Sequence, residues 1–277
     1  MNARGRRIGK AALEICAWLV GLVYLFPLYL EFTIALKTQE DFKQNLYGLP
    51  RPFTFSNLSV VWKRMHVPAV TLRSLLIAAV SIAGIVLFSS LAAYAIARRN
   101  NRFYRAMYVF FIAGMMVPFQ LSMIPLYKLI RWFGMMSSYQ GVICIYIGSG
   151  ISLATMIFTG FIRTIPRELD ESAMMDGCTK LRTYSTIILP FLAPAVISVI
   201  VFMGVYIWND LLTPLLFLGS KKATIITALY SFRGATYTTD WTMVFAGSVL
   251  AMIPLTTLFL FSQRYFIKGM MAGALKG

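Results

Sequence analysis

Six long stretches of this chain contain no Asp, Glu, Lys or Arg, and they limit the folds that the chain can adopt. They are residues 15–30, 74–97, 106–127, 132–162, 183–209 and 241–263. A helix needs about 20 mostly apolar residues to cross a bilayer, and five of the runs reach that length unaided. The first run reaches it if Glu31 lies near the outer interface and the helix continues to Leu36. The sequence therefore predicts an all-α integral membrane protein with six transmembrane helices.

The composition argues against the ordinary soluble classes. Of the 277 residues, 58% are hydrophobic and 13% are charged, whereas a soluble domain carries about 25% charged residues. The net charge of +16 is spread between apolar runs, so it does not form the exposed basic face that nucleic-acid binding requires. The cysteines at 16, 144 and 178 are far apart and His66 is the single histidine, so neither a disulfide framework nor a metal site is predicted.

The basic residues of the connecting loops predict the orientation. Residues 1–11, 98–105, 163–182 and 264–277 carry 15 Lys and Arg, against 10 in the opposite loops. Because the basic side of a membrane protein usually faces the cytoplasm, we expect both termini there. The apolar stretch after the basic start continues to Leu36, which is too long for a signal peptide, so an uncleaved first span is expected.

The chain lacks the motifs of an enzyme and of an ion-coupled carrier. It has no HExxH, GxSxG or GxxxxGK[ST] sequence. The six runs contain no ionisable relay of the kind that proton- or ion-driven transporters carry. The sequence is therefore consistent with two functions: a transporter powered by another protein, or a passive pore. A self-contained channel or secondary carrier is one alternative, and a membrane enzyme is a second.

The stretch between the fourth and fifth predicted spans, residues 164–190, is polar and contains helix signals. Pro166 and Glu168 favour a helix start, which predicts a short helix over residues 166–175. Asp176-Gly177 would end it, because glycine adopts the left-handed turn without steric cost. A second helix is expected from about Thr179 into the fifth span. Methionines at 174 and 175 give the first helix an adaptable apolar side, which favours a docking surface over a merely solvated loop.

This segment resembles the cytoplasmic signature of the binding-protein-dependent import permeases of ABC transporters. That signature reads E-A-A, three residues, Gly, nine residues, Ile, one residue and Leu-Pro. The chain has Glu171-Ser172-Ala173, Gly177, Ile187 and Leu189-Pro190 at the same spacings, with Ser172 in place of the second alanine. Trp208-Asn209-Asp210 resembles the W-N-[DE] segment of sugar-uptake permeases. Residues 263–277 resemble the C-terminus of maltose-permease-like subunits.

The resemblance implies a type I ABC importer permease fold in the bacterial plasma (inner) membrane. Residues 1–69 would form an N-terminal tail, the first helix and an outer loop, and residues 70–263 the ABC transmembrane type-1 domain. Residues 264–277 would be a cytoplasmic tail. The implied partners are a second permease in a heterodimer, two cytoplasmic ABC ATPases, an extracytoplasmic sugar-binding protein and membrane lipid. ATP and Mg would bind to the ATPase, so this chain would hold no cofactor, metal or catalytic residue.

The resemblance also implies roles for particular residues. The ATPase-coupling residues would be Glu171, Ser172, Ala173, Met175, Asp176, Gly177, Leu189 and Pro190. Trp208, Asn209 and Asp210 would line or gate the substrate path. The alternative is that Asn209 and Asp210 form a pair at the interface that faces water or caps the helix end. The 218–240 loop would contact the binding protein, or would be merely solvated. We expect sugar import, and import of a non-sugar solute stays an alternative.

Overall fold

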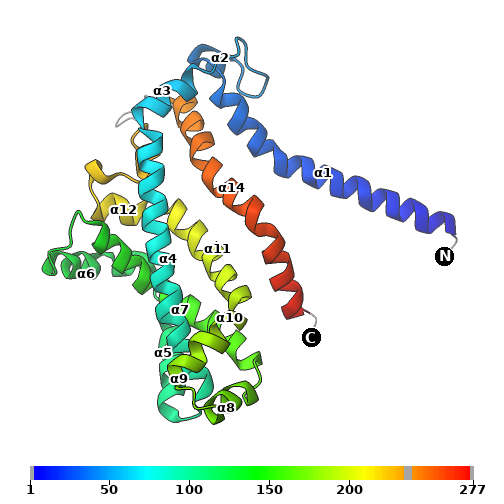
Figure 1. Cartoon of the computed structure of the whole chain (residues 1–277). Coiled ribbons are helices and arrows are strands. Elements are labelled where there is room, and N and C mark those ends of the chain that lie inside the picture. The colour runs from blue at the N-terminus through cyan, green and yellow to red at the C-terminus, as the bar shows by residue number, and fades with distance from the viewer. Residues whose placement is uncertain (1–2, 234–238, 275–277) are drawn as a thin grey trace. The chain divides into compact units, whose positions relative to one another are not determined.

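The computed structural model of the chain describes residues 3–233 and 239–274, and its regular structure in these ranges is helical (Figure 1). The chain divides into two compact units. The first contains Met1–Pro68 and Ala228–Ile253, and the second contains Ala69–Thr227 and Pro254–Gly277. Each unit is described by itself below.

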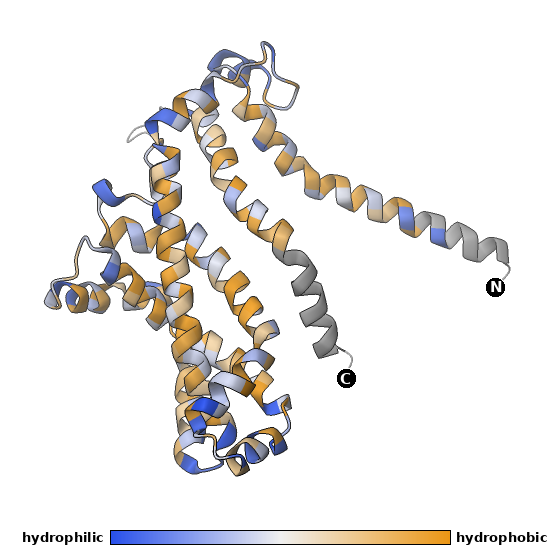
Figure 2. Ribbon diagram, viewed as in Figure 1, coloured by the Kyte–Doolittle hydropathy of each residue, from blue (hydrophilic) through white to orange (hydrophobic). Residues whose placement is uncertain are grey.

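Four helices are long and apolar enough to cross a membrane. They lie within α1 (Ala3–Ala35), α4 (Val67–Arg98), α7 (Tyr139–Thr164) and α14 (Trp241–Ala274). Figure 2 shows hydrophobic residues along these helices and hydrophilic residues mainly at their ends and in the connections. Two further pairs of helices qualify only together, so the described residues contain between four and six candidate spans. The predicted apolar helices are confirmed at this coarser level.

Both helix pairs are sharply bent, and both bends lie beside prolines within the apolar runs. In the third apolar run, α5 (Arg102–Met115) meets α6 (Phe119–Trp132) at 103°. Pro118 occupies the N-cap of α6, and proline both lacks an N–H donor and disfavours helix at the preceding residue. In the fifth run, the segment Lys180–Phe191 meets Ala193–Asn209 at 73°. Each of these runs is therefore a broken span or a re-entrant segment.

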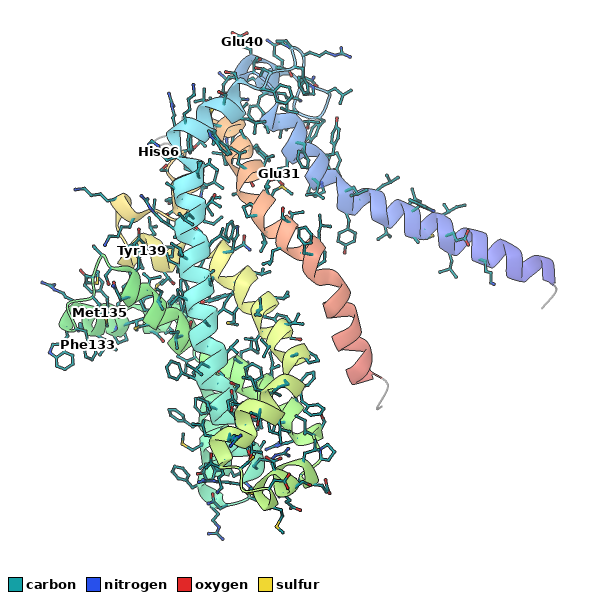
Figure 3. The ribbon with its side chains drawn as sticks, in the orientation of Figure 1. Glu31, Glu40, His66, Phe133, Met135 and Tyr139 are labelled. Carbon is teal, nitrogen blue, oxygen red and sulfur yellow. The ribbon has the colours of Figure 1, made fainter. Side chains whose placement is uncertain are left out.

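The fourth predicted run, residues 132–162, begins with a turn and continues as a helix. Helix α6 ends at Trp132 and α7 begins only at Tyr139. Between them Gly134 and Ser137 have φ values of 70° and 53°, and a left-handed backbone cannot continue an α-helix. Figure 3 labels Phe133, Met135 and Tyr139 around this connection. The candidate span in this run, Tyr139–Thr164, therefore starts later than the run itself, because composition alone does not separate an uncharged turn from an apolar helix.

In the first unit, the apolar surface of α1 is open while the loop that follows it is folded. In the most apolar stretch of Leu13–Ala35, none of the residues is buried. After α1, the fully buried Lys37 donates its Nζ hydrogens to the carbonyls of Asn45 and Leu46. Asn57 donates to the carbonyls of Ala35 and Lys37 at 3.0 and 2.7 Å. These bonds hold α2 (Gln39–Gln44) and α3 (Ser56–Arg64) against the end of α1.

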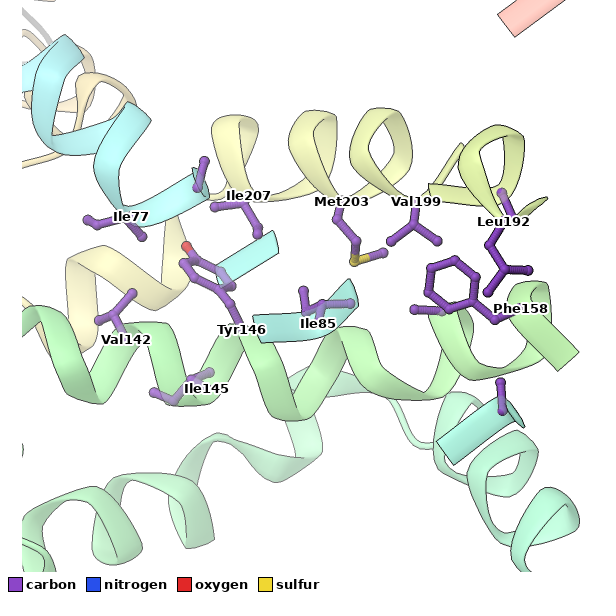
Figure 4. Close-up of a cluster of buried hydrophobic side chains, with 14 of the residues drawn as sticks. Ile77, Ile85, Val142, Ile145, Tyr146, Phe158, Leu192, Val199, Met203 and Ile207 are labelled. Carbon is purple, nitrogen blue, oxygen red and sulfur yellow. The ribbon is translucent and has the colours of Figure 1, made fainter. Parts of the chain in front are cut away.

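In the second unit, α7 packs beside α5 and α11 (Ala193–Asn209) and supplies much of the buried core. Tyr146 and Phe158 of α7 are almost completely buried. Figure 4 shows them facing Ile85 of α4 and the α11 side chains of Val199 and Met203. This packing fixes α7 against α4 and α11. The polar side chains of the candidate site lie on or next to these three helices and on the 164–190 segment.

The remaining elements of the second unit are short. They are α8 (Glu168–Met175), α9 (Lys180–Thr183), the π-helical turn η1 (Tyr184–Ile188), α10 (Leu189–Phe191), α12 (Leu212–Phe217) and the 3-10 turn η2 (Ser220–Lys222). The last short helix, α13 (Ile225–Tyr230), crosses from the second unit into the first.

Candidate functional site

The 164–190 segment forms the two helices that the sequence predicts, joined by a tight turn. The first, α8, begins at Glu168, two residues later than expected, so Pro166 precedes the helix instead of lying in its first turn. Three acidic residues occupy the first turn of α8: Glu168, Asp170 and Glu171. Carboxylates at this end are favourable because the helix dipole is positive there.

Gly177 ends α8 as predicted. Its φ is +79°, and an added Cβ would meet no heavy atom within 4 Å. The requirement for glycine is therefore conformational and not steric crowding. The N–H groups of Gly177 and Cys178 donate to the carbonyls of Met174 and Ala173 at 3.1 and 2.9 Å. These bonds satisfy the last carbonyls of the helix in the manner of a Schellman motif.

Helix α8 has one buried side and one open side. Asp170 and Ala173 are 6% and 4% exposed. On the open side Met175 is 88% exposed and Met174 is 45% exposed, and Glu171 is also exposed. Ser172 is exposed and donates its hydroxyl to the Glu168 carbonyl at 2.7 Å. The structure thus presents methionine and a carboxylate together on a surface that no element in the described part of the chain covers.

Gly177 separates the segment into two arms: α8 before it, and α9, η1 and α10 after it. The second arm leads into α11 through a π-helical turn. Thr179 caps α9 by accepting the Arg182 N–H. The turn η1 follows, and its Tyr184 and Ile188 are buried. Leu189 and Pro190, which the signature predicts for coupling, form α10 next to the bend into α11. A π turn is uncommon and often marks a functional position in a helix.

A buried polar cluster that sequence reasoning missed holds α8 to α4. Arg98 Nη2 lies 2.8 Å from Asp170 Oδ2, and the two side chains are 12% and 8% exposed. The Tyr94 hydroxyl donates to Asp170 Oδ1 at 2.6 Å. This is the one ion pair found among the described residues. Its partners lie far apart in the sequence, and the only local signal was an Asp next to Glu171 in the signature.

At the other end of α11, Asp210 has protein partners for both carboxylate oxygens. Oδ2 accepts the Tyr146 hydroxyl at 3.0 Å, and Oδ1 accepts the Leu212 N–H at 2.9 Å. Asn209 is exposed and donates to the Val205 carbonyl at 2.9 Å. Trp208 is buried. This geometry favours a structural cap for Asp210, and the role of these three residues in a substrate path stays a prediction.

Three hollows lie within the second unit. One, of about 440 Å³, is bounded by α4 and the 164–190 segment, including Tyr94, Arg98 and Asp170. A second, of about 600 Å³, is almost wholly apolar and runs along α4, α11 and part of α14. The third, of about 770 Å³, lies among α5, α6, α7 and α11 and includes the hydroxyls of Ser122, Ser149 and Tyr206. Among the described residues no group of three or more His, Cys, Asp and Glu could hold a metal ion.

The structure describes only part of the 218–240 loop and of the C-terminal segment 263–277, for which the sequence made predictions. In the 218–240 loop, Lys222 donates to the Ser137 carbonyl at 2.6 Å and lies over the Tyr139 ring. Tyr237 lies outside the described residues. For the C-terminal resemblance, the backbone of α14 is helical to Ala274, while the side chains of 262–277 also lie outside the described part of the chain.

Comparison with known proteins gives consistent matches along the chain. Residues 85–272 match the family model described as "Binding-protein-dependent transport system inner membrane component". The melibiose/raffinose/stachyose import permease protein MelC of Bacillus subtilis is 33% identical over 96% of both chains. The probable starch degradation products transport system permease protein AmyC of Thermoanaerobacterium thermosulfurigenes is 30% identical over 97% of this chain and 98% of its own length.

Solved structures show the same fold. A chain of a bacterial ABC transporter involved in the import of the acidic polysaccharide alginate superimposes with a TM-score of 0.81 at 17% identity, over 96% of this chain and 99% of that chain. A chain of the alginate transporter in complex with its alginate pentasaccharide-bound periplasmic protein gives 0.66 at 16% identity, over 93% and 94%.

Proposed function

Because this chain belongs to the family of inner membrane components of binding-protein-dependent transport systems, we propose that it is one permease subunit of an ATP-driven sugar importer. It would form the translocation path with a second permease. Two cytoplasmic ABC ATPases would supply the energy, with ATP and Mg bound to them, and an extracytoplasmic binding protein would deliver the sugar. The sugar class follows from the relatives, which are named as permeases for oligosaccharides and starch products.

The open face of α8 is the observation that carries the coupling role. Glu171, Met174 and Met175 are exposed, and the helix that bears them is closed by the left-handed Gly177 and leads directly into α11. Exposed methionine beside a carboxylate suits a partner with an apolar cleft and a basic group. A short rigid helix joined to a spanning segment can pass a rigid-body motion of that partner to the bundle.

Recruitment of the ATPase tests this role. The chain is co-expressed with a second permease and an ABC ATPase from the same genome, and the ATPase that co-purifies is measured. We expect Glu171→Lys to abolish recruitment while membrane insertion is retained. Glu40→Lys is the matched control, because Glu40 is also exposed and in the first turn of a short helix, α2. Normal recruitment and uptake with Glu171→Lys would contradict the docking role.

A self-contained channel or carrier is the principal rival function. The purified chain alone is reconstituted in proteoliposomes with radiolabelled oligosaccharide, and the complete set of subunits is reconstituted in parallel. We expect uptake only with the complete set, ATP and the binding protein. Uptake by the single chain would establish the rival. If the complete set of subunits takes up a non-sugar solute but no sugar, the sugar assignment is wrong and the permease assignment still holds.

We also propose six spans with both termini in the cytoplasm, each bent pair counting as one span. The test uses variants with Cys16, Cys144 and Cys178 replaced by Ser and one cysteine added. Tyr47→Cys reports the outer loop and Asn100→Cys the α4–α5 connection, and both positions are exposed. In intact cells, an impermeant maleimide is expected to label Tyr47→Cys only. Labelling of Asn100→Cys before permeabilisation would reverse the orientation.

A further inference from the structure

We propose that the last three turns of α4 receive the motion of the 164–190 segment, with Tyr94, Arg98 and Asp170 as positioning residues for coupling. This inference rests on the proposed function, because it concerns how an ATPase-driven movement of α8 reaches the bundle. It assigns the transmission to a face of α4 that lies outside the signature. Two ties, meaning sets of polar contacts between side chains, support this inference. One attaches α8, and the other attaches the π turn η1.

The first tie joins α8 to both α4 and α7. Arg98 Nη2 lies 2.8 Å from Asp170 Oδ2 as an ion pair, and the Tyr94 hydroxyl donates to Asp170 Oδ1 at 2.6 Å. Arg98 Nη1 also donates to the carbonyls of Ile162 and Ile165 at 3.2 and 3.0 Å, where α7 ends. One guanidinium therefore binds the ends of two long helices to the carboxylate of α8.

The second tie joins the π turn to the same helix. The hydroxyls of Ser90 and Tyr184 lie 2.6 Å apart, and Tyr184 is 4% exposed. The rings of Tyr94 and Tyr184 are 5.6 Å apart, so the two ties are in contact. Ser90, Tyr94 and Arg98 follow each other at intervals of four residues, which places them on one face of α4. Both arms of the segment are thus attached to that face.

Polar bonds from Asp170 fix the place of α8 together with the apolar packing of Leu169 and Ala173. Of its eight residues only Asp170 and Ala173 are buried, and the hollow of about 440 Å³ beside the ion pair shows that the surroundings are not close-packed. Removing one partner of a buried ion pair leaves the other charge uncompensated, which is strongly destabilising. A displacement of α8 consequently has to move α4 and the end of α7, or break the pair.

The test measures sugar transported per ATP hydrolysed in the complete reconstituted transporter. Asp170→Asn keeps the shape and removes the charge. We expect it to retain ATPase recruitment and basal hydrolysis, and to lower the transported sugar per ATP at least tenfold. The charge exchange Arg98→Asp with Asp170→Arg is expected to recover a third or more of the lost ratio. A role in folding alone would not predict recovery of this ratio at constant ATPase content.

Milder variants keep the test valid if Asp170→Asn does not assemble. Tyr94→Phe removes one hydroxyl from the first tie and Ser90→Ala one from the second, and each is expected to lower the ratio three- to tenfold. Ser89→Ala is the matched control, because its equally buried hydroxyl faces the Ile151 carbonyl of α7 at 3.4 Å and not the segment. A wild-type ratio in Tyr94→Phe and Ser90→Ala overturns the inference.

Failure of the proposed function would look different. If the wild-type complex does not form or does not couple sugar transport to ATP hydrolysis, the proposed function is wrong whatever the variants do. If the wild-type complex couples normally and the assembled variants at 90, 94 and 170 do so equally, only the receiving role of α4 is wrong.

Discussion

The hydroxyl of Tyr146 on α7 donates to the carboxylate of Asp210 at 3.0 Å, so a buried tyrosine is bonded to the residue that ends α11. The other carboxylate oxygen accepts the Leu212 N–H at the start of α12. Asp210 therefore closes the junction of three helices. This occupation of both oxygens is the physical argument for a structural role within the Trp208-Asn209-Asp210 sequence.

We expect Asp210→Ala to destabilise the assembled protein. Loss of the carboxylate leaves the buried Tyr146 hydroxyl without this partner, which costs about 1–3 kcal/mol, and it also removes the acceptor of the Leu212 N–H. Asn209→Ala is the control, because Asn209 is exposed and bonds only within its own helix. The thermal midpoint of the purified complex is measured together with uptake. Lost uptake at an unchanged midpoint in Asp210→Ala would instead support a role in the substrate path.

Replacing Gly177 by valine is expected to strain the turn after α8. A non-glycine residue in the left-handed conformation costs roughly 1–2 kcal/mol, and the φ of +79° requires that conformation. Gly177→Asn is the matched variant, because asparagine tolerates this region far better. We expect weaker ATPase recruitment with valine than with asparagine, measured by co-purification. Equal recruitment by both variants would show that the turn conformation does not matter.

Gly141→Ala is expected to disturb the start of α7. A Cβ there would lie 2.4 Å from the backbone carbonyl oxygen of Met135, which has no freedom to rotate away as a side chain does. Overpacking of this kind costs about 1–3 kcal/mol. At Gly148, also in α7, a Cβ would meet nothing within 4 Å, so Gly148→Ala should keep or raise the wild-type thermal midpoint, because alanine favours a helix interior over glycine. The prediction fails if both variants melt alike.

Lys37→Met is expected to loosen the loop that follows α1. The fully buried ammonium group bonds the carbonyls of Asn45 and Leu46, and methionine fills similar space without a donor. A buried carbonyl left unsatisfied costs about 1–3 kcal/mol. Limited proteolysis should cut the loop faster in Lys37→Met than in Lys43→Met, whose lysine is exposed. Equal cleavage rates would rule out the anchoring role.

Local signals in the sequence predicted the helical runs and the turn at Gly177, but not the breaks within the runs. Pro118 was visible as a proline in an apolar run, yet prolines also occur in kinked but continuous membrane helices. The turn at Gly134 and Ser137 contains no charge that would separate it from a span. Apolarity measures compatibility with hydrocarbon and does not measure whether the backbone is continuous.

The buried polar contacts were beyond prediction from one sequence. Tyr94 and Asp170 are separated by 76 positions and Tyr146 and Asp210 by 64. Lys37 looked like an ordinary loop lysine, because the carbonyls that it binds belong to the backbone and leave no mark on residue identity. The signature residues from Glu171 to Pro190 were identifiable by spacing, while their attachment to α4 was not.

The sequence by itself determined that most of this chain is apolar helix, because long uncharged runs can satisfy their backbone in a bilayer only as helices. It also determined the turn after α8, because glycine adopts a left-handed backbone without the steric cost that other residues carry. Tertiary structure alone decided which polar groups meet: Asp170 with Arg98, and Asp210 with Tyr146. The physical reason is that burial makes each such group need a partner, and only the packing of helices distant in sequence determines which partner is within reach.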